Sequence, residues 1–346
     1  MAFARSSLIL ANYFSRAQQG VIATEGYVAR SILITGNGIG LALDSNFFSL
    51  ENGLESVWNN TEHLSNDHKD LILSAIEGTT DELPPSSEDQ LDKLQVAIVA
   101  TEFLSNFEVS GTSWISEPAK ELPSTFRKYI HEVALHYQRS GQSLPKTFVE
   151  PLSEFVRSTK THVVTLNYDN LLYDAFIAEK ILNGYHGALI DGFWSSGFDE
   201  EHLDRHNVNR HGWYMHLHGS PLFIENNKVM YAGRDFLDPE DKCHIVLTHV
   251  EHKPLIIGSS HILSAYWRRL EKAFEESSQI ILFGYSGYDE HLNNRIKLRK
   301  DEKELLIVEW EGAGSEHERK RFWETKTGFN RFELVRLENI LEFTSW

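Results

Sequence analysis

The sequence has a single cysteine, Cys243, among its 346 residues. One thiol cannot form an internal disulfide, and it cannot supply the several thiolates of a structural zinc site. No apolar run approaches the roughly 18 residues that a membrane span needs, and the first residues do not follow a signal-peptide pattern. These absences predict a cytoplasmic protein with no membrane contact and no structural zinc.

The chain also has fewer basic than acidic residues. Lysine and arginine number 33 against 50 aspartate and glutamate residues, so the formal net charge is −17. A field of this sign repels phosphates, and we therefore expect no direct nucleic-acid binding. The hydrophobic share of 41% and the charged share of 24% are those of an ordinary globular protein. At 346 residues the chain exceeds the usual size of one core, which indicates two domains or one domain with an insertion.

Short apolar runs that end in glycine or polar turns recur along the chain, and they alternate with helical patterns. Such runs predict buried strands, and the alternation predicts an α/β fold: a Rossmann-like parallel sheet covered by helices on both faces. Ligands bind such sheets at the carboxyl ends of the strands. The predicted strands are 31–35, 162–166, 255–257, 279–283 and 305–308, and the helix before 279 has apolar positions Leu263, Trp267, Leu270 and Phe274.

The segment 51–154 has a different character, because it starts with an acidic stretch and continues with two helical patterns. We expect it to be an α-helical insertion subdomain, and residues 1–50 and 155–346 to form one discontinuous Rossmann-like core. The two helices are expected to pack on each other. The insertion is a candidate surface for a partner, and a solvated decoration is the alternative. The helical positions are Val96, Val99, Phe103 and Phe107, then Phe126, Ile130, Val133 and Tyr137.

Three predicted strand ends carry residues suited to a nucleotide: Gly36-Asn37-Gly38-Ile39-Gly40, Asn167-Tyr168-Asp169 and Gly284-Tyr285-Ser286. Glycines let the backbone approach a pyrophosphate, and a following helix offers unpaired N–H groups. Each motif also has a structural alternative. The glycines could form a plain turn, and Asp169 could cap the next helix.

Histidines raise the question of a metal site. His216 and His218 alternate within Met215-His216-Leu217-His218-Gly219-Ser220 and would share one face of a strand, but no carboxylate or thiolate at a familiar spacing completes a metal site. Cys243-His244 with His249 and His252 matches no standard zinc spacing, and a histidine-rich surface loop is the simpler interpretation. We therefore expect no metal.

The order of these motifs resembles that of the sirtuin-like NAD-binding proteins. A glycine loop, Thr-x-Asn-x-Asp, His-Gly-Ser and a late Gly-Tyr-Ser follow one another at about 31–50 and 161–309. The resemblance implies that Asn167 and His218 are catalytic and that Asp169 is their acidic partner. It also implies NAD⁺ contacts for the remaining motif residues: Gly36, Asn37, Gly38, Gly40, Asp169, Gly284, Tyr285, Ser286 and Asp289.

Departures from that pattern indicate which activity to expect. Protein deacylases of the family bind zinc through four cysteines, whereas this chain has one. Gly40 stands where deacylases carry serine, and their following arginine has no counterpart in the segment from Asp44 to Phe48. What remains resembles the zinc-free sirtuin-like effectors of prokaryotic antiphage defence, which hydrolyse NAD⁺ to nicotinamide and ADP-ribose.

We therefore expect an NAD⁺ glycohydrolase that depletes NAD⁺ in abortive infection. Activation would come from homo-oligomerisation or from a separate sensor subunit, and a nucleotide-sensing partner of the Kongming type is one possibility implied by the resemblance. Asn167 would orient the ribose and the attacking water, and His218 would accept a proton. The alternatives are a module that senses NAD⁺ or ADP-ribose without turnover, and transfer chemistry on a protein, either deacylation or ADP-ribosylation.

Overall fold

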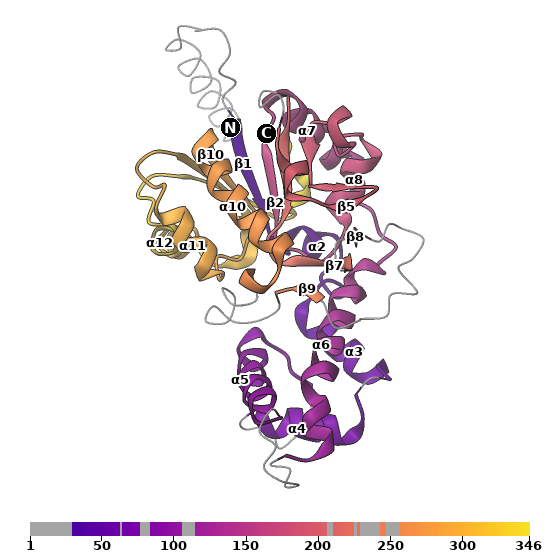
Figure 1. The fold of residues 1–346 in the computed structure, drawn as a ribbon. Helices are drawn as coiled ribbons and strands as arrows, with labels where there is room; N and C mark the ends of the chain where they lie inside the picture. The colour runs from indigo at the N-terminus through magenta and orange to yellow at the C-terminus, as the bar shows by residue number, and fades with distance from the viewer. Residues whose placement is uncertain are drawn as a thin grey trace, which may run out of the picture.

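The computed structural model describes residues 30–62, 64–76, 84–105, 115–205, 210–224, 227–228, 243–246 and 257–346. Within these ranges a parallel sheet of seven strands forms the core, in the order β12-β11-β10-β1-β2-β6-β3 (Figure 1). This confirms the predicted Rossmann-like α/β fold. The strands are β1 (Arg30–Thr35), β2 (His162–Thr165), β3 (Leu189–Ile190), β6 (Gly212–His216), β10 (Ser277–Phe283), β11 (Glu304–Trp310) and β12 (Glu333–Leu337).

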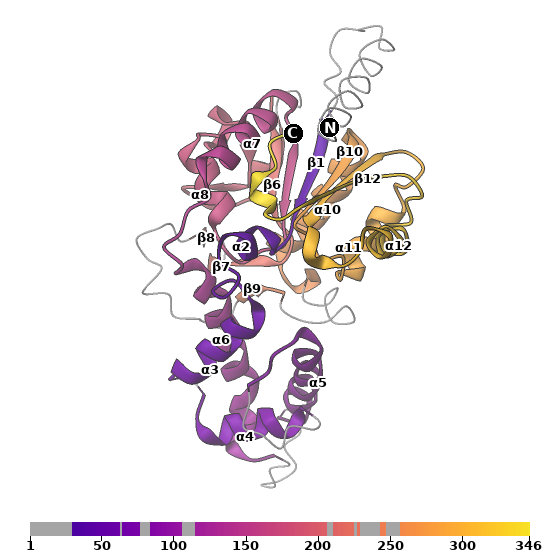
Figure 2. The same ribbon diagram turned by 180° about the vertical axis from the view of Figure 1, so that it is seen from behind.

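Both faces of the sheet are buried under helices, as the continuous apolar strands predict. Successive residues of β1 enter opposite cores: Ile32 and Ile34 lie on one face and Leu33 on the other, all fully buried. Figure 2 shows the sheet between its two helical layers. Helices α10 (His261–Glu276), α11 (Glu290–Lys297) and α12 (Glu316–Thr327) cover the face of Ile32, and α2 (Gly38–Leu43), α7 (Lys146–Thr159) and α8 (Leu171–Ala178) the face of Leu33.

Most of the predicted strands are present. The runs at 31–35, 162–166, 279–283 and 305–308 correspond to β1, β2, β10 and β11. The predicted strand at 255–257 falls mainly outside the described residues, and Ile257 itself lies in a helical turn. Strands β3, β6 and β12 were not predicted. In β12, at the edge of the sheet, charged residues flank and interrupt the apolar ones, so no continuous apolar run marks it.

The strand order reverses between β1 and β10, and the carboxyl edge of the sheet at this point is called the crevice below. From β1 the chain proceeds to β2 and then outward to β6, and it later returns to pair β10 with the free side of β1. The point where strand order reverses is where open α/β sheets bind ligands. The strand ends also align, because Thr35 pairs with both Thr165 and Phe283, and Thr165 pairs with His216.

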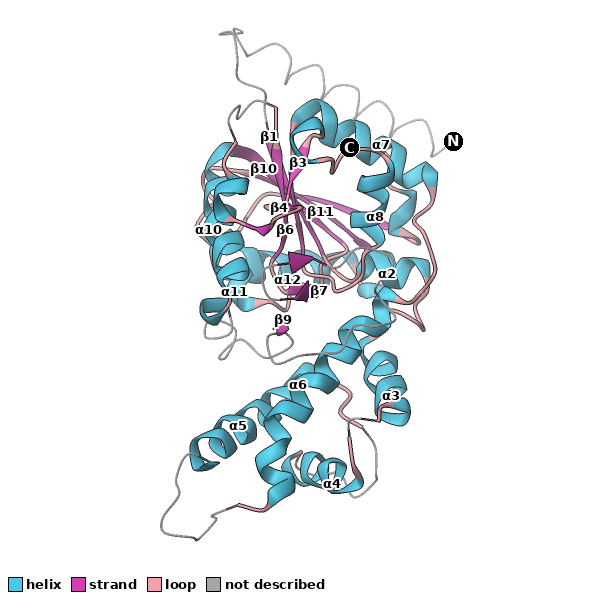
Figure 3. Cartoon of the chain, turned by 45° about the vertical axis from the view of Figure 1, so that its right-hand side comes forward, coloured by secondary structure: helices cyan, strands magenta, loops and turns pink. Residues whose placement is uncertain are grey.

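Two small antiparallel sheets and four helices complete the described fold. The hairpins are β4 (Phe193–Trp194) with β5 (Gly197–Phe198), and β7 (Gly219–Ile224) with β8 (Asn227–Lys228) and β9 (Cys243–Ile245). Helices α3 (Leu50–Asn60), α4 (Asn66–Ala75), α5 (Glu88–Ser105) and α6 (Glu117–Gln138) form a lobe that projects from the sheet, with α6 running from its far end back to the core (Figure 3).

The predicted packing of α5 on α6 is present, and the predicted face of α6 is buried, but the contact face predicted for α5 is wrong. Leu91, Leu94 and Ile98 are the buried positions of α5, whereas Val96 and Val99 are 55% and 42% exposed. Phe103 is exposed as well, and Phe107 lies outside the described residues. Two apolar stripes on one helix have the same spacing, so periodicity alone could not choose between them.

Helix α7 starts inside the segment predicted as the insertion, yet it packs on the sheet. The ring centroid of Phe148 lies 5.4 Å from that of Phe283 at the end of β10. The boundary at residue 154 stays a prediction. Among the described helices, none combines the length and apolar character that a bilayer crossing requires.

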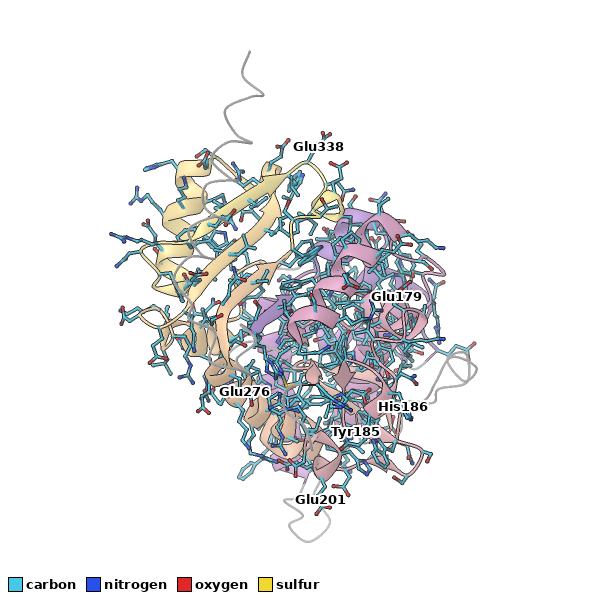
Figure 4. All side chains as sticks on the ribbon, turned by 90° about the horizontal axis from the view of Figure 1, so that it is seen from above. Glu179, Tyr185, His186, Glu201, Glu276 and Glu338 are labelled. Carbon is cyan, nitrogen blue, oxygen red and sulfur yellow. The ribbon has the colours of Figure 1, made fainter. Side chains whose placement is uncertain are left out.

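The amino edge of the sheet, opposite the crevice, is closed by an ion cluster around Glu276. Its Oε2 lies 2.9 Å from Arg30 Nη1 and 3.2 Å from His162 Nε2, and Arg205 contacts its other oxygen (Figure 4). Burial alone would raise the pKa of Glu276, but its bonds to His162 and Arg205 outweigh this and lower the pKa to about 2. The cluster ties together the first residues of β1 and β2, and it lies at the edge of the sheet opposite the strand ends where a ligand is expected.

Candidate active site

The glycine loop after β1 is packed directly against the end of β10. The N–H of Gly36 donates to the Phe283 carbonyl at 3.1 Å, and the N–H of Gly38 donates to the Gly284 carbonyl at 2.9 Å. A Cβ atom on Gly38 would lie 2.6 Å from Gly284 Cα, closer than any side chain permits. These glycines are required because two backbones meet, and the N–H groups of Gly36 and Gly38 bond within the protein. Their predicted contact with NAD⁺ stays a prediction.

Asn37 and Gly40 fix the segment that follows the glycine loop. The amide of Asn37 donates to the Phe48 carbonyl at 2.7 Å. A Cβ atom on Gly40 would lie 2.7 Å from Cγ of the Phe48 ring, so this position also needs glycine. Both residues thus stand at the crevice but act on Phe48, and their predicted NAD⁺ contact stays a prediction.

Asn167 lies at the end of β2 and bridges to the glycine loop. Its Nδ2 donates to the Gly36 carbonyl at 3.1 Å, and its own N–H donates to Thr165 Oγ1 at 3.1 Å. The Oδ1 atom is buried and has no hydrogen-bond partner among the described residues. Leaving such an acceptor unpaired costs about 1–3 kcal/mol, so this carbonyl oxygen is a place where a bound substrate or water would gain a bond.

Asp169 follows two residues later and precedes Asn170, which is the N-cap of α8, so the capping alternative for Asp169 is wrong in detail. Its Oδ1 accepts a hydrogen bond from the N–H of Leu171, the first residue of α8, at 2.9 Å. The carboxyl is only 6% exposed. Burial raises the pKa of Asp169 to about 6, against the lowering effect of its backbone hydrogen bonds. The carboxyl group therefore changes charge near pH 6 instead of near pH 4.

His218 occupies the turn after β6, opposite Asn167 on the neighbouring strand. Its Nε2 lies 2.7 Å from Oδ2 of Asp289, and both side chains are buried. The other carboxylate oxygen of Asp289 accepts from the Leu292 N–H at 3.0 Å and caps α11. Gly219 makes the turn possible, since its φ is +82° and a Cβ there would lie 1.6 Å from the His244 carbonyl oxygen.

The Gly284-Tyr285-Ser286 turn after β10 divides into buried and exposed parts. Tyr285 is 4% exposed, and its hydroxyl donates to Asn293 Oδ1 at 2.9 Å while accepting from the Asp289 N–H at 3.1 Å. It therefore supports the turn that places Asp289, and its predicted contact with NAD⁺ stays a prediction. Ser286 is exposed at the tip of the turn. Gly284 has a φ of +58° and touches Gly38.

His216 belongs to a different environment from His218. It ends β6 with its ring among those of Tyr173, Tyr214 and Phe223, and neither ring nitrogen has a hydrogen-bond partner in the described part of the chain. Burial lowers the pKa of His216 well below its usual value, so the ring is neutral. The described residues hold no group of three or more histidine, cysteine, aspartate or glutamate side chains that could bind a metal.

The other proposed histidine cluster is only partly described. His244 Nδ1 lies 2.7 Å from Ser260 Oγ, the N-cap of α10. The side chain of Cys243, together with His249 and His252, lies outside the described residues.

Three features of this site were missed from the sequence. They are the pairing of His218 with Asp289, the bond from the Tyr168 hydroxyl to the Val246 carbonyl at 2.5 Å, and the contact of Gln138 with the Tyr168 carbonyl. Each joins residues that are far apart in the chain. Only the strand order, which the sequence does not state, brings them together.

The family model of the SIR2-like domain matches residues 161–327, which include Asn167, Asp169, His218 and the segment from Gly284 to Asp289. No curated protein matches the chain. SIR2-like domains use NAD⁺, and the match is compatible with an NAD-dependent enzyme. A SIR2-like domain is thus present at residues 161–327, which supports a sirtuin-like family for this chain.

Proposed function

We propose that the protein is an NAD⁺ hydrolase that cleaves the bond between nicotinamide and ribose. The observation that carries this proposal is the buried pair of His218 and Asp289, whose atoms Nε2 and Oδ2 are 2.7 Å apart at the carboxyl edge of the sheet. A module that only senses a nucleotide has no need for an imidazole paired with a carboxylate. A general base is the usual use of such a pair.

The reaction places modest demands on the protein. The leaving group is a cationic pyridinium, which takes the electron pair of the broken C–N bond and departs as neutral nicotinamide. Water forms the new C–O bond at the anomeric carbon and gives up one proton. The protein therefore has to orient the ribose, exclude other nucleophiles and accept that proton.

His218 is the proposed proton acceptor. When its Nε2–H donates to Asp289, the ring has its lone pair on Nδ1, which can accept a proton from water or from a ribose hydroxyl. The negative charge of Asp289 then stabilises the imidazolium that forms. Asp289 acts here through His218, so its proposed role differs from the direct NAD⁺ contact that the resemblance implies.

Asn167 is the proposed orienting group. With Nδ2 committed to the Gly36 carbonyl, its buried Oδ1 is fixed as an acceptor toward the crevice edge. Such an oxygen can accept a hydrogen bond from a ribose hydroxyl or from the attacking water. The tie to Gly36 sets this oxygen relative to the glycine loop.

The proposed setting is antiviral defence by NAD⁺ depletion. A hydrolase that is always active would exhaust the NAD⁺ of its own cell, so the activity has to wait for a trigger. We propose that this trigger is homo-oligomerisation or a separate sensor subunit, such as one that senses a nucleotide. The helical lobe of α3–α6 offers a surface for such a subunit.

The test measures nicotinamide release from NAD⁺ by the purified full chain, alone and together with the proteins encoded beside its gene and an extract of infected cells. Asn167→Ala and His218→Ala should each reduce release by at least about 100-fold. His186→Ala is the matched control, because His186 is an exposed histidine before β3 at the amino edge of the sheet. Full activity in either site variant would refute the assigned roles.

The same samples separate hydrolysis from sensing. Calorimetric binding of NAD⁺ or ADP-ribose without nicotinamide release, under every condition tested, would favour a sensing module. Label from NAD⁺ that appears on a protein acceptor would instead favour ADP-ribosyl transfer. Release of free ADP-ribose in amounts equal to nicotinamide is the outcome expected of a hydrolase.

A further inference from the structure

The last turn of α6 reaches the crevice from the helical lobe. Its final residue, Gln138, is 6% exposed, and its Nε2 donates to the backbone carbonyl of Tyr168. Tyr168 stands between Asn167 and Asp169, so this bond attaches α6 to the loop that carries the proposed orienting group. Only a donor can face a carbonyl oxygen, which fixes the orientation of the Gln138 amide.

The preceding residue, Tyr137, holds the other side of the crevice. Its hydroxyl donates to the Ser49 carbonyl at 3.0 Å, and its ring stacks on Phe48 with centroids 6.3 Å apart. Phe48 in turn accepts the bond from Asn37 of the glycine loop. Burial, with a smaller contribution from the charge of Asp169, raises the pKa of Tyr137, so this phenol stays a hydrogen-bond donor.

Two adjacent residues of one helix thus contact the two loops that flank the site. Neighbouring positions on a helix point about 100° apart, which lets Tyr137 and Gln138 reach in different directions. We propose that Gln138 is a positioning residue for the Asn167–Asp169 loop, and that the last turn of α6 braces this loop against the glycine-loop side.

Stability alone is a poor reason for glutamine at this position. The Oε1 atom of Gln138 is buried and accepts no hydrogen bond from the described residues. A leucine of similar size would remove that unpaired acceptor, which stabilises the fold, but it would also leave the Tyr168 carbonyl without its donor, which destabilises it. These two changes in the free energy of unfolding are opposite in sign and similar in size. A structural role and a positioning role therefore predict different results for Gln138→Leu.

The first experiment follows hydrogen–deuterium exchange of the full chain by mass spectrometry. In Gln138→Leu, peptides covering residues 165–172 should exchange at least about tenfold faster, while those covering β10 and β11 should not change and the melting temperature should stay close to that of the wild type. Gln142→Ala is the matched control, because its amide donates instead to Asp44 Oδ2 at 2.9 Å. Unchanged exchange at 165–172, or equal acceleration in the control, would overturn the proposal.

The second experiment measures activity and rests on the proposed NAD⁺ hydrolysis. Gln138→Leu should lower kcat for nicotinamide release at least about tenfold with little change in KM, because the loop can still bind substrate but spends less time in the productive position. Absence of cleavage by the wild type would count against the proposed function alone, because the exchange measurement tests the brace without any turnover.

Gln138→Glu adds a readout that a packing role would not produce. A protonated carboxyl can donate to the Tyr168 carbonyl, whereas a carboxylate cannot. The ratio of variant to wild-type activity should therefore be highest at acidic pH and fall as pH rises. A ratio that does not change with pH would show that the donated hydrogen bond is irrelevant to the reaction.

Discussion

Asp289 Oδ2 lies 2.7 Å from Nε2 of His218, although 71 residues separate the two in the chain. The same aspartate caps α11 through its other oxygen. One side chain therefore fixes a helix and an imidazole together, and the two effects can be separated by substitution.

Asp289→Asn should lower kcat for nicotinamide release on the order of 10³-fold while the protein stays folded. The asparagine oxygen can still accept the Leu292 N–H, so the cap survives. Its amide, however, can donate to Nε2 of His218 and favour the tautomer that has its proton on Nδ1, which cannot act as the base there. Single-turnover kinetics with a thermal melt would check both parts.

Asp289→Ala serves as the comparison, because it removes the cap as well. It should be less stable than Asp289→Asn by about 1 kcal/mol while being no more active. If Asp289→Asn kept wild-type kcat, the pairing with His218 would have no part in the reaction.

Gly38→Ala should destabilise the protein by about 1–3 kcal/mol and weaken NAD⁺ binding. The new methyl group would lie 2.6 Å from Gly284 Cα and 2.7 Å from the Gly284 carbonyl oxygen, and neither backbone can move without opening the contact between β1 and β10. Urea unfolding and calorimetric titration with NAD⁺ are the measurements. Gly258→Ala is the control, since its Cβ would meet nothing within 4 Å, and equal losses in both variants would contradict the argument.

The raised pKa of Asp169 predicts that the free energy of unfolding depends on pH. Burial raises its pKa from 3.8 to about 6, so the folded protein binds this proton more tightly than the unfolded chain does. The resulting stabilisation is complete below about pH 4 and is lost as pH rises to about 6. Asp169→Asn does not titrate, so its free energy of unfolding relative to the wild type should increase across this window by up to about 3 kcal/mol.

Urea unfolding of both proteins at constant ionic strength between pH 4 and pH 7 would measure this difference. A difference that stays constant with pH would mean that the carboxyl titrates normally in the folded state. A difference that decreases would mean that the carboxylate form is the stabilised one.

The fold and the position of the site could be predicted because buried parallel strands have a recognisable sequence pattern, a short apolar run that ends in a turn. The run from Ser31 to Thr35 has three apolar residues in a row, Ile32 to Ile34, and leads into a glycine loop, and Asn167 follows a similar run. Such strands must lie inside a sheet, and their carboxyl ends must share one edge. This reasoning places Asn167 at that edge, whereas the expectation for His218 comes from the resemblance, because β6 is not evident from the sequence.

Features that depend on neighbouring strands could not be predicted in the same way. The glycine loop predicts an approach of the backbone to a phosphate, and the structure adds that the absent side chain of Gly38 makes room for Gly284. The resemblance implies an NAD⁺ contact for Asp289, and the structure adds His218 as its partner. These relationships follow from the return of β10 to β1, which no local pattern encodes.

The central position of β1 has a consequence for how the protein is made. Its two neighbours are β2 at His162–Thr165 and β10 at Ser277–Phe283, and Ser278 bonds to Arg30 across 248 residues of sequence. At about 5–20 residues per second, a ribosome needs many seconds to connect them. Until residue 289 has emerged, the glycine loop has no β10 to pack on and His218 has no carboxylate. The growing chain is therefore incapable of the proposed chemistry, which begins only when nearly all of the core has been translated.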